Sequence, residues 1–310
     1  MARHQFAIPP NISLALASAL WAVATVISKQ LLTSVPPITL LVLQLAPSVV
    51  VLWLLVVASG RKYLAWRDLF PVALIGVLNP GLSYTLSMLG LSQTTASVAT
   101  LLWAAEPALI VALAWCVLRE VITTRLVAFT VTAACGVVLV SGLLSRDNLT
   151  AGSGLGATFV LGGVLCCALY TVLSRKIALS IDPLLTVTIQ QTVGLLWAAA
   201  IWPLELHGNA ADAVLALPAR ELVGGMITGL MYYALAFWLY LSGLRLVPAS
   251  TAGIFINLTP VFGVAAAYVF LGERLSQTQW LGAAIILASV CALLLSGKSE
   301  VNTPAPSSTP

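Results

Sequence analysis

The sequence has 310 residues, of which 60% are hydrophobic and 8% are Asp, Glu, Lys or Arg. Soluble domains carry about 25% charged residues, so with a mean hydropathy of +1.04 this chain has too few polar side chains to cover a globule in water. These values exclude a soluble enzyme, a nucleic-acid-binding protein and a disordered protein. The net charge of +4 comes from 14 basic and 10 acidic residues, which are too sparse to form a polyanion-binding surface.

Apolar runs long enough to cross a bilayer follow one another along almost the whole chain. A transmembrane helix needs about 20 mostly apolar residues, and these runs lack the alternation of barrel strands. The sequence therefore predicts an all-α integral membrane protein with ten transmembrane helices, the first of which is not cleaved as a signal peptide. The ten segments are 11–33, 38–58, 69–90, 95–118, 125–144, 155–175, 184–204, 221–243, 249–271 and 278–296.

The basic residues predict the orientation of the chain. If the N-terminus is cytoplasmic, ten basic residues fall in cytoplasmic segments and four in extracytoplasmic ones. This excess follows the positive-inside rule. We therefore expect a protein of the cell (inner) membrane with both termini in the cytoplasm. The four extracytoplasmic basic residues are Lys29, Arg146, Arg220 and Arg274.

The five cysteines all fall within predicted helices, and none has the spacing of a metal site. The sequence has only two histidines, His4 and His207. We interpret the cysteines as small packing residues and expect no metal, cofactor or disulfide. The sequence also lacks a Gly-x-x-x-x-Gly-Lys-Ser/Thr run and a catalytic motif, so we expect neither an ATPase nor another enzyme.

The chain contains an internal repeat. At a shift of 153 residues, Pro107 pairs with Pro260 and Glu120 pairs with Glu273. Nearer the chain start, TVISK matches TVLSR at a shift of 146 residues. General apolarity does not explain paired prolines and glutamates at the same spacing, so the repeat unit is a group of five helices.

An odd number of helices per repeat means that the second half enters the membrane from the opposite side. The two halves are then related by a two-fold axis in the membrane plane, the arrangement that transporters use for alternating access around a central site. We predict two inverted five-helix repeats around a central cavity. The predicted units are residues 1–149, residues 150–298 and a disordered tail, 299–310.

Several of these positions resemble a known family. Two features resemble the EamA branch of the drug/metabolite transporter superfamily. The first is Ala19-Leu20-Trp21, and the second, found in both halves, is Gly-Leu, four residues, Ala-Ser, a helical proline and Leu-x-Glu. The resemblance implies a carrier whose cavity is lined by spans 1, 3, 4, 6, 8 and 9 and which exports small metabolites, often amino acids. Two differences between the repeats weaken the transfer of a symmetric gate from the family to this chain. Cys167 is aligned with Trp21, and Arg119 is aligned with Gly272.

Glu106 is the one acidic residue near the middle of a predicted span. A carboxylate at that depth costs about 2.5–3.5 kcal/mol, so it normally faces a cavity or a partner. The functional interpretation is a contact for a substrate amine or a protonation site. The structural alternative is an acid that bonds a backbone group freed by Pro107, which the frequent Glu-Pro pair of the family favours.

Three prolines, Pro80, Pro107 and Pro260, predict helix breaks or hinges inside spans. Backbone groups freed in this way are tolerated against protein or a water-filled cavity, so the breaks point towards one. Asn79 precedes Pro80, and Asn257 lies three residues before Pro260. Each asparagine either satisfies a freed carbonyl or binds substrate.

Aromatic side chains form the remaining candidate cavity wall, where they would pack an apolar substrate. The alternative is a position facing lipid, which is common for such residues. We favour the cavity for Trp21, Tyr84 and Phe237, which occupy repeat-equivalent or family-motif positions, and the lipid-facing alternative for the others. The candidates are Trp21, Tyr84, Trp103, Tyr233 and Phe237.

Lys29 and Arg175 end matched helices on opposite sides of the membrane. They are candidates for gating or for binding a substrate carboxylate, and the alternative is that they reach towards lipid headgroups.

These features together predict a secondary transporter that exports small metabolites by alternating access. Amino acids with aromatic or other apolar side chains, and their derivatives, are the expected substrates. The alternatives are a channel-like facilitator and an exporter of drugs or other metabolites. The expected partners are the small-molecule substrate and membrane lipid, without nucleic acid, in a monomer or weak homo-oligomer.

Overall fold

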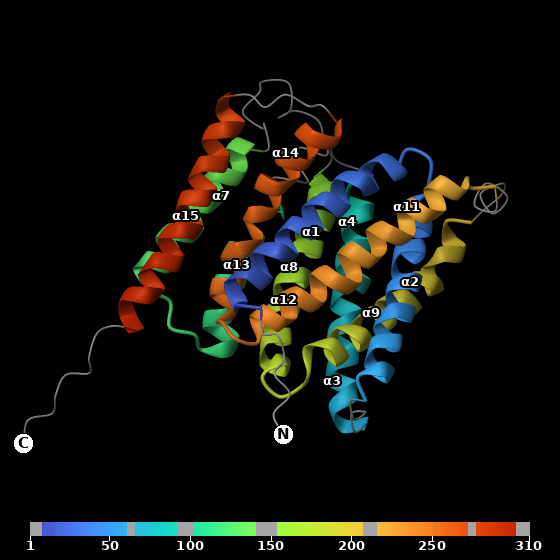
Figure 1. Cartoon of the computed structure of the whole chain (residues 1–310), viewed down its shortest axis with the longest axis horizontal. Helices are drawn as coiled ribbons and strands as arrows, with labels where there is room; N and C mark the ends of the chain where they lie inside the picture. Colours follow the sequence, from blue (N-terminus) through green and yellow to red (C-terminus); the bar gives the residue numbers. More distant parts are fainter. Residues whose placement is uncertain are drawn as a thin grey trace, which may run out of the picture.

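The computed structural model describes residues 8–60, 66–91, 102–103, 105–140, 154–206, 216–271 and 277–301. All regular structure in these ranges is helical, and Figure 1 shows the helices packed into one bundle. The elements are α1 (Pro10–Leu31), α2 (Pro37–Ala58), α3 (Trp66–Gly76), η1 (Val77–Leu82), α4 (Ser83–Leu91), α6 (Glu106–Leu113), η2 (Ala114–Leu118), α7 (Thr124–Val140), α8 (Gly154–Ala178), α9 (Pro183–Ile201), η3 (Trp202–Leu204), α11 (Ala219–Gly229), η4 (Leu230–Ala236), α12 (Phe237–Leu244), α13 (Ala249–Ile256), α14 (Leu258–Leu271) and α15 (Gln277–Val301).

The helices confirm the predicted membrane fold. Six helical stretches in the described residues are long and apolar enough to cross a membrane. Four shorter apolar helices, which begin at Glu106, Thr124, Ala249 and Trp280, occupy the remaining predicted spans. The start of the fourth predicted span lies outside the described residues, as do residues 207–215, between the seventh and eighth predicted spans.

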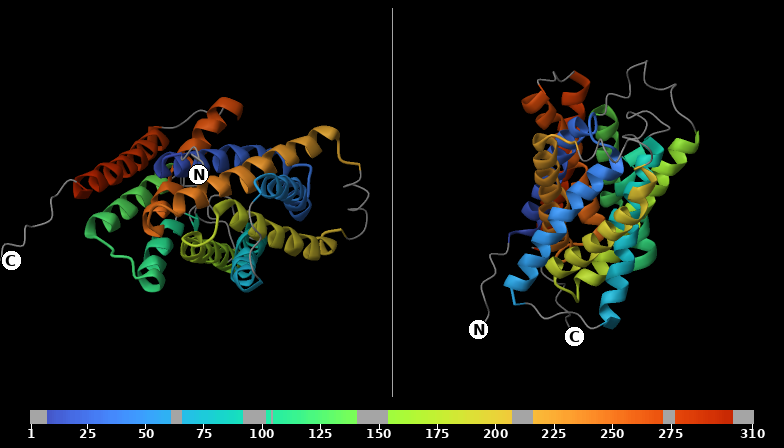
Figure 2. Two further views of the ribbon diagram at one scale, coloured as in Figure 1. Left: turned by 60° about the horizontal axis from the view of Figure 1, so that its bottom comes forward. Right: turned by 90° about the vertical axis from the view of Figure 1, so that its right-hand side faces the viewer.

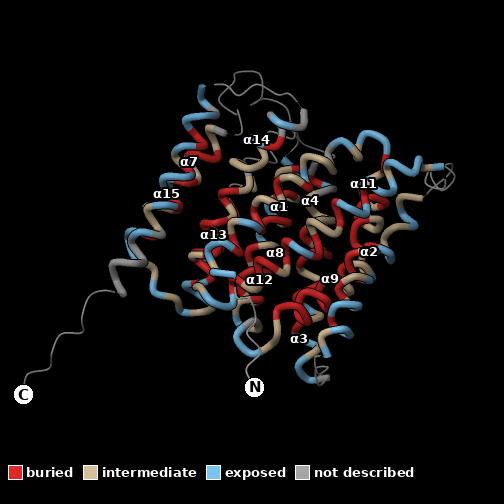
Figure 3. Tube along the Cα trace, in the orientation of Figure 1, coloured by how far each residue is buried: buried red, intermediate tan, exposed pale blue. Residues whose placement is uncertain are grey.

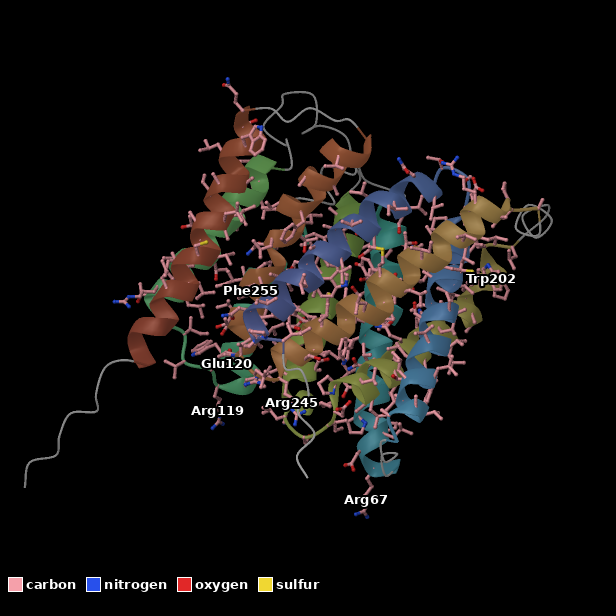
Figure 4. The ribbon with its side chains drawn as sticks, in the orientation of Figure 1. Arg67, Arg119, Glu120, Trp202, Arg245 and Phe255 are labelled. Carbon is pink, nitrogen blue, oxygen red and sulfur yellow. The ribbon has the colours of Figure 1, made fainter. Side chains whose placement is uncertain are left out.

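Both ends of the described chain lie at the same end of the bundle. Figure 1 places the start of α1 and the end of α15 at its lower side. Figure 4 places Arg67, Arg119 and Arg245 at that same end. This arrangement agrees with an even number of crossings and with the grouping of basic residues that the sequence predicts.

Proline sets the start of several helices. Pro10, Pro37 and Pro183 stand in the first turns of α1, α2 and α9, where the fixed φ suits a helix and the missing N–H removes no hydrogen bond. At α9, the Asp182 side chain also accepts the backbone N–H of Leu184 at 2.9 Å. These caps fix where each span begins.

The third span of each half is interrupted by a wider helical turn at the same place. η1 begins at Val77 and η4 begins at Leu230, which are 153 residues apart. Within η1, Asn79 has an extended backbone with φ −148° and ψ 124°. The predicted break at Pro80 therefore lies in a segment whose counterpart in the second half also departs from the α-helix.

The two halves interlock through matched glycines. A Cβ added at Gly76 would stand 2.8 Å from the carbonyl oxygen of Gln190, and one added at Gly229 would stand 2.5 Å from the Cα of Gln44. Gly76 and Gly229 are repeat partners at the shift of 153, and Gln44 and Gln190 are partners at the shift of 146. In each half, therefore, the third span lies directly against the second span of the other half.

A matched hydrogen bond supports each of these contacts. Gln44 Nε2 donates to Ser28 Oγ at 2.7 Å, and Gln190 Nε2 donates to Ser174 Oγ at 3.2 Å. All four residues are related by the shift of 146. The halves therefore share their interior contacts as well as their helix order, which is what an inverted repeat requires.

The fifth and tenth spans stand apart from this interlock. Figures 1 and 2 show α7 and α15 side by side at one edge of the bundle, and the two helices are in contact. Figure 3 shows buried residues concentrated in the other helices, around α1, α8, α9 and α12. The interior that could hold a site is thus formed by the spans other than α7 and α15.

The matched glycines yield a stability prediction. Gly229→Ala places a methyl group against the backbone of Gln44, which should lower the melting temperature of the purified protein through overpacking of about 1–3 kcal/mol. Gly162→Ala is the matched control, because its Cβ would stand 3.4 Å from a side-chain atom of Leu86. Equal melting temperatures for the two variants would contradict the interlock.

Candidate substrate site at the centre of the bundle

The interrupted spans bring a set of polar and aromatic side chains together between the two halves. We call this set the central layer. It draws on α1, η1, α4, α6, α8, η4 and α12, and its most buried members include Asn79, 0% exposed, and Glu106, 5% exposed. The central layer consists of Trp21, Asn79, Tyr84, Glu106, Cys167, Tyr232 and Phe237.

One part of the central layer is an aromatic cluster, formed by Trp21, Tyr232 and Phe237. The rings of Trp21 and Phe237 meet edge-on, with centroids 5.2 Å apart and an interplanar angle of 73°. Tyr232 lies 6.2 Å from Trp21 and 6.1 Å from Phe237. Such distances are typical of favourable aromatic pairs, so the cluster is a packed apolar surface.

The other part is a polar cluster, formed by Asn79, Tyr84, Glu106 and Cys167. Asn79 Nδ2 donates to Cys167 Sγ at 2.9 Å. A side-chain hydrogen bond also links Cys167 with Glu106, and Tyr84 lies close enough to the thiol for an electrostatic interaction. Cys167 is therefore the common contact of this cluster, although its sequence context suggested only packing.

A hydrogen bond joins the two clusters. Tyr84 Oη donates to Tyr232 Oη at 2.6 Å, and the two rings meet edge-on with centroids 5.9 Å apart. Tyr233 packs on the other side of the junction, 5.8 Å from Tyr84 and stacked on Phe237. The central layer is thus continuous from the thiol of Cys167 to the indole of Trp21.

Several buried polar atoms in and beside this layer have no hydrogen-bond partner among the residues that the structure describes. The acceptor is Asn79 Oδ1, the donors are Trp21 Nε1 and Asn257 Nδ2, and Thr259 Oγ1 can do either. A buried polar group left unpaired costs about 1–3 kcal/mol. A ligand that supplies complementary groups would therefore bind here in preference to an apolar molecule of the same size.

The structure brings together most of the predicted site residues. Trp21, Asn79, Tyr84, Glu106, Tyr233 and Phe237 all lie in or against the central layer. Asn257 is buried directly after α13, which lies against α1 through a hydrogen bond from Ser18 to the carbonyl of Phe255. Trp103 packs against Val160 and Val164 of α8.

The remaining predicted residues have more local positions. Pro80 is buried in η1, and Pro107 stands in the first turn of α6. The side chains of Pro260 and Lys29 lie outside the described part of the chain. Arg175 Nη1 donates to the carbonyl oxygens of Leu244, at 2.8 Å, and Arg245, so it satisfies the end of α12.

Sequence reasoning did not select two members of the central layer, Cys167 and Tyr232. The repeat could have indicated both, because Cys167 is the repeat partner of Trp21 and Tyr232 is the repeat partner of Asn79, and both partners are predicted site residues. From the sequence alone, Cys167 is interpreted as a packing residue and as a departure that weakens the transfer of a symmetric gate, whereas the structure gives this position polar contacts of its own.

The predicted repeat glutamate Glu120 closes one end of the interior. Its carboxylate accepts the backbone N–H groups of Ala249, at 2.8 Å, and Ser250, at 3.1 Å, and the Ser250 hydroxyl at 2.6 Å. Figure 4 shows Glu120 at the end of the bundle that also carries Arg119 and Arg245. A carboxylate at a helix N-terminus is favourable, so Glu120 ties the fourth span to the start of α13 in the other half.

Loss of this cap should weaken the closed end. Glu120→Ala removes the acceptor for all three donors and should destabilise the protein by about 1–2 kcal/mol, measured as a lower melting temperature of the purified protein. Asp68→Ala is the control, because Asp68 is an exposed acid in the first turn of α3. An unchanged melting temperature for Glu120→Ala would show that the cap does not hold this end.

Comparison with known proteins identifies the family. YetK of Bacillus subtilis, an uncharacterized transporter, is 27% identical over 299 residues, which cover 95% of this chain and 89% of YetK. YvbV of the same species, also an uncharacterized transporter, is 24% identical over 91% of this chain and 90% of its own length.

A shorter match has a more specific name. A probable terminal-alkyne amino-acid exporter of Streptantibioticus cattleyicolor is 41% identical over 51 residues, which cover 16% of this chain and 17% of the exporter.

A solved crystal structure has the same fold, with a TM-score of 0.72 at 18% identity over 95% of this chain and 99% of the other. The EamA-like transporter family matches residues 9–142 and 154–295, one match in each half of the chain. The chain therefore belongs to the EamA-like transporter family.

Proposed function

We propose that this protein is a secondary transporter that exports amino acids with aromatic or other apolar side chains, and their derivatives, by alternating access. Membership of a transporter family supports the general activity. The short match to a protein named as a probable amino-acid exporter supports the substrate class. The resemblance of the sequence to the EamA branch, whose members often export amino acids, points in the same direction.

The central layer is the observation that carries the proposal. It combines unpaired buried polar atoms with a packed aromatic surface, at the point where the third span of each half departs from the α-helix. Substrate sites of inverted-repeat transporters are built at interrupted helices near the midplane. An amino acid with an apolar side chain presents a charged end and an apolar end, which are the two chemistries that this layer offers.

The cap made by Glu120 supports the transport cycle. It joins the two halves at one end of the central layer, so its release would open a path to that end. Its repeat partner Glu273 and the matching segment at Ala96 and Ser97 lie outside the described residues. In the proposed cycle the two ends open in turn, because inverted halves can exchange conformations.

The basic residues support the proposed orientation. Arg67, Arg119 and Arg245 share the end of the bundle at which α1 begins. Under the positive-inside rule this end faces the cytoplasm. The proposed location is the inner membrane, with both chain termini on the cytoplasmic side and the substrate carried away from it.

Counterflow tests the proposed function. Proteoliposomes containing the purified protein and loaded with unlabelled phenylalanine should take up labelled phenylalanine faster than unloaded ones, because a carrier reorients faster when occupied. Labelled sugars should show no such acceleration. Equal phenylalanine uptake with and without internal phenylalanine would support a channel-like facilitator, and acceleration by sugars alone would contradict the substrate class.

The aromatic cluster yields a second transport prediction. Trp21→Ala removes the ring that contacts Phe237 and Tyr232 and should raise the KM for phenylalanine about tenfold. Trp115→Ala is the matched control, since Trp115 is 63% exposed on the outside of the bundle. Equal effects of the two substitutions would place the substrate away from the central layer.

A further inference from the structure

The two clusters of the central layer occupy equivalent places in the two halves. Each aromatic residue of one cluster is the repeat partner of a residue in the other, at the same shifts that relate the interior contacts. The pairs are Trp21 with Cys167, Tyr232 with Asn79, and Phe237 with Tyr84.

The contacts within the clusters follow the same symmetry. Trp21 of the first half meets Tyr232 and Phe237 of the second, and Cys167 of the second half accepts a hydrogen bond from Asn79 of the first and interacts electrostatically with Tyr84. The scaffold around them is matched as well, as the paired hydrogen bonds of Gln44 and Gln190 show. The two halves therefore share the same backbone framework. The side chains around Cys167 are mainly polar, whereas those around Trp21 are mainly apolar.

Glu106 increases this difference. Its repeat partner is Thr259, so the first half places a carboxyl group where the second has a hydroxyl. Glu106 is buried and contacts Cys167, and none of the described basic side chains pairs with it. Beside it, Asn79 Oδ1 is a buried acceptor without a partner. The polar cluster thus presents acceptors that an ammonium group can satisfy.

The aromatic cluster cannot provide the same environment. Its members Trp21, Tyr232 and Phe237 carry no charge, and their rings pack against one another at 5.2–6.2 Å. A desolvated ammonium group would lose its hydration there without gaining a carboxylate partner. An apolar or aromatic group would instead gain ring contacts.

From this broken symmetry we infer that the central layer binds amphipathic primary amines, amino acids among them, in one orientation. The ammonium group lies against Glu106 and Asn79, and the apolar group lies against Trp21 and Phe237. This inference deepens the proposed function and rests on the central layer being the transport site. Cys167 has a specific part in it, because its thiol contacts both Asn79 and Glu106, whereas its repeat partner, Trp21, carries an indole.

Two probes that differ only at the polar end test the orientation. Phenethylamine has an ammonium group and a phenyl ring, and 3-phenylpropionate has a carboxylate in place of the amine. Calorimetric titration of the purified protein should give phenethylamine at least about tenfold tighter binding than 3-phenylpropionate, since a hydrogen bond between charged groups is strong and Glu106 repels the carboxylate. Equal binding of the two probes would overturn the inference.

Substitutions at the polar end locate the preference. Glu106→Gln should reduce the advantage of phenethylamine to about threefold or less, and Asn79→Ala should weaken the amine independently. Cys166→Ala is the matched control, because Cys166 neighbours Cys167 on α8 and is no part of the central layer. An amine preference that survives Glu106→Gln, with the melting temperature unchanged, would overturn the inference.

The apolar end is tested by comparing phenethylamine with ethylamine, which lacks the ring. The ring should strengthen binding about tenfold in the original protein and much less in Trp21→Ala. If phenylalanine shows counterflow but neither phenyl probe binds, the orientation is wrong and the proposed function stands. If phenylalanine shows no counterflow, but phenethylamine still binds more tightly than 3-phenylpropionate and this difference depends on Glu106, the proposed transport function is wrong and the amine-binding site is supported.

Discussion

The close approach of Gly76 to Gln190 and of Gly229 to Gln44 is the contact on which the rest of the structure depends. It sets the third span of each half directly against the second span of the other half, with backbone on backbone. Larger residues at either glycine would separate the halves. Since the same contact occurs twice, the interior has an approximate two-fold symmetry before any side chain of the site is considered.

Inside a membrane, polar groups have to be satisfied by the protein itself. The structure meets this condition at the helix ends through carboxylates. Glu120 caps α13, and Glu205 accepts the backbone N–H groups of Ile38 and Thr39 at the start of α2. At the centre the condition is not met, because Asn79 Oδ1 and Trp21 Nε1 lack partners within the described ranges. Other buried atoms without a partner among the described residues, on Ser87, Gln191 and Glu221, lie outside the central layer, whereas these two lie in the proposed substrate site.

The ten apolar segments and the repeat could be predicted because both follow from patterns along the sequence, without knowledge of which helices are in contact. Hydropathy over about 20 residues identifies a span, and Pro107 with Glu120 recurs as Pro260 with Glu273 at one spacing. Glu106 could also be selected, since a carboxyl group within an apolar run is conspicuous without any knowledge of its neighbours.

The contacts of the site could not be predicted in the same way. Cys167 has the sequence context of a small packing residue, and its partner Asn79 is 88 positions away. Trp103 has the context of a cavity residue, and the sequence alone does not show that it packs with Val160 and Val164 of α8. Arg175 ends a helix like many cations that reach for headgroups, and only the fold shows that it satisfies carbonyls 69 and 70 positions further on. Each outcome depends on which helix lies opposite, which the sequence does not state.

The most direct test of the account is a crystal structure with bound 4-bromophenylalanine, in which anomalous scattering locates the bromine. We expect the bromine beside Trp21 and Phe237, with the ammonium group at Glu106, whereas bromine beside Cys167 or outside the central layer would contradict it.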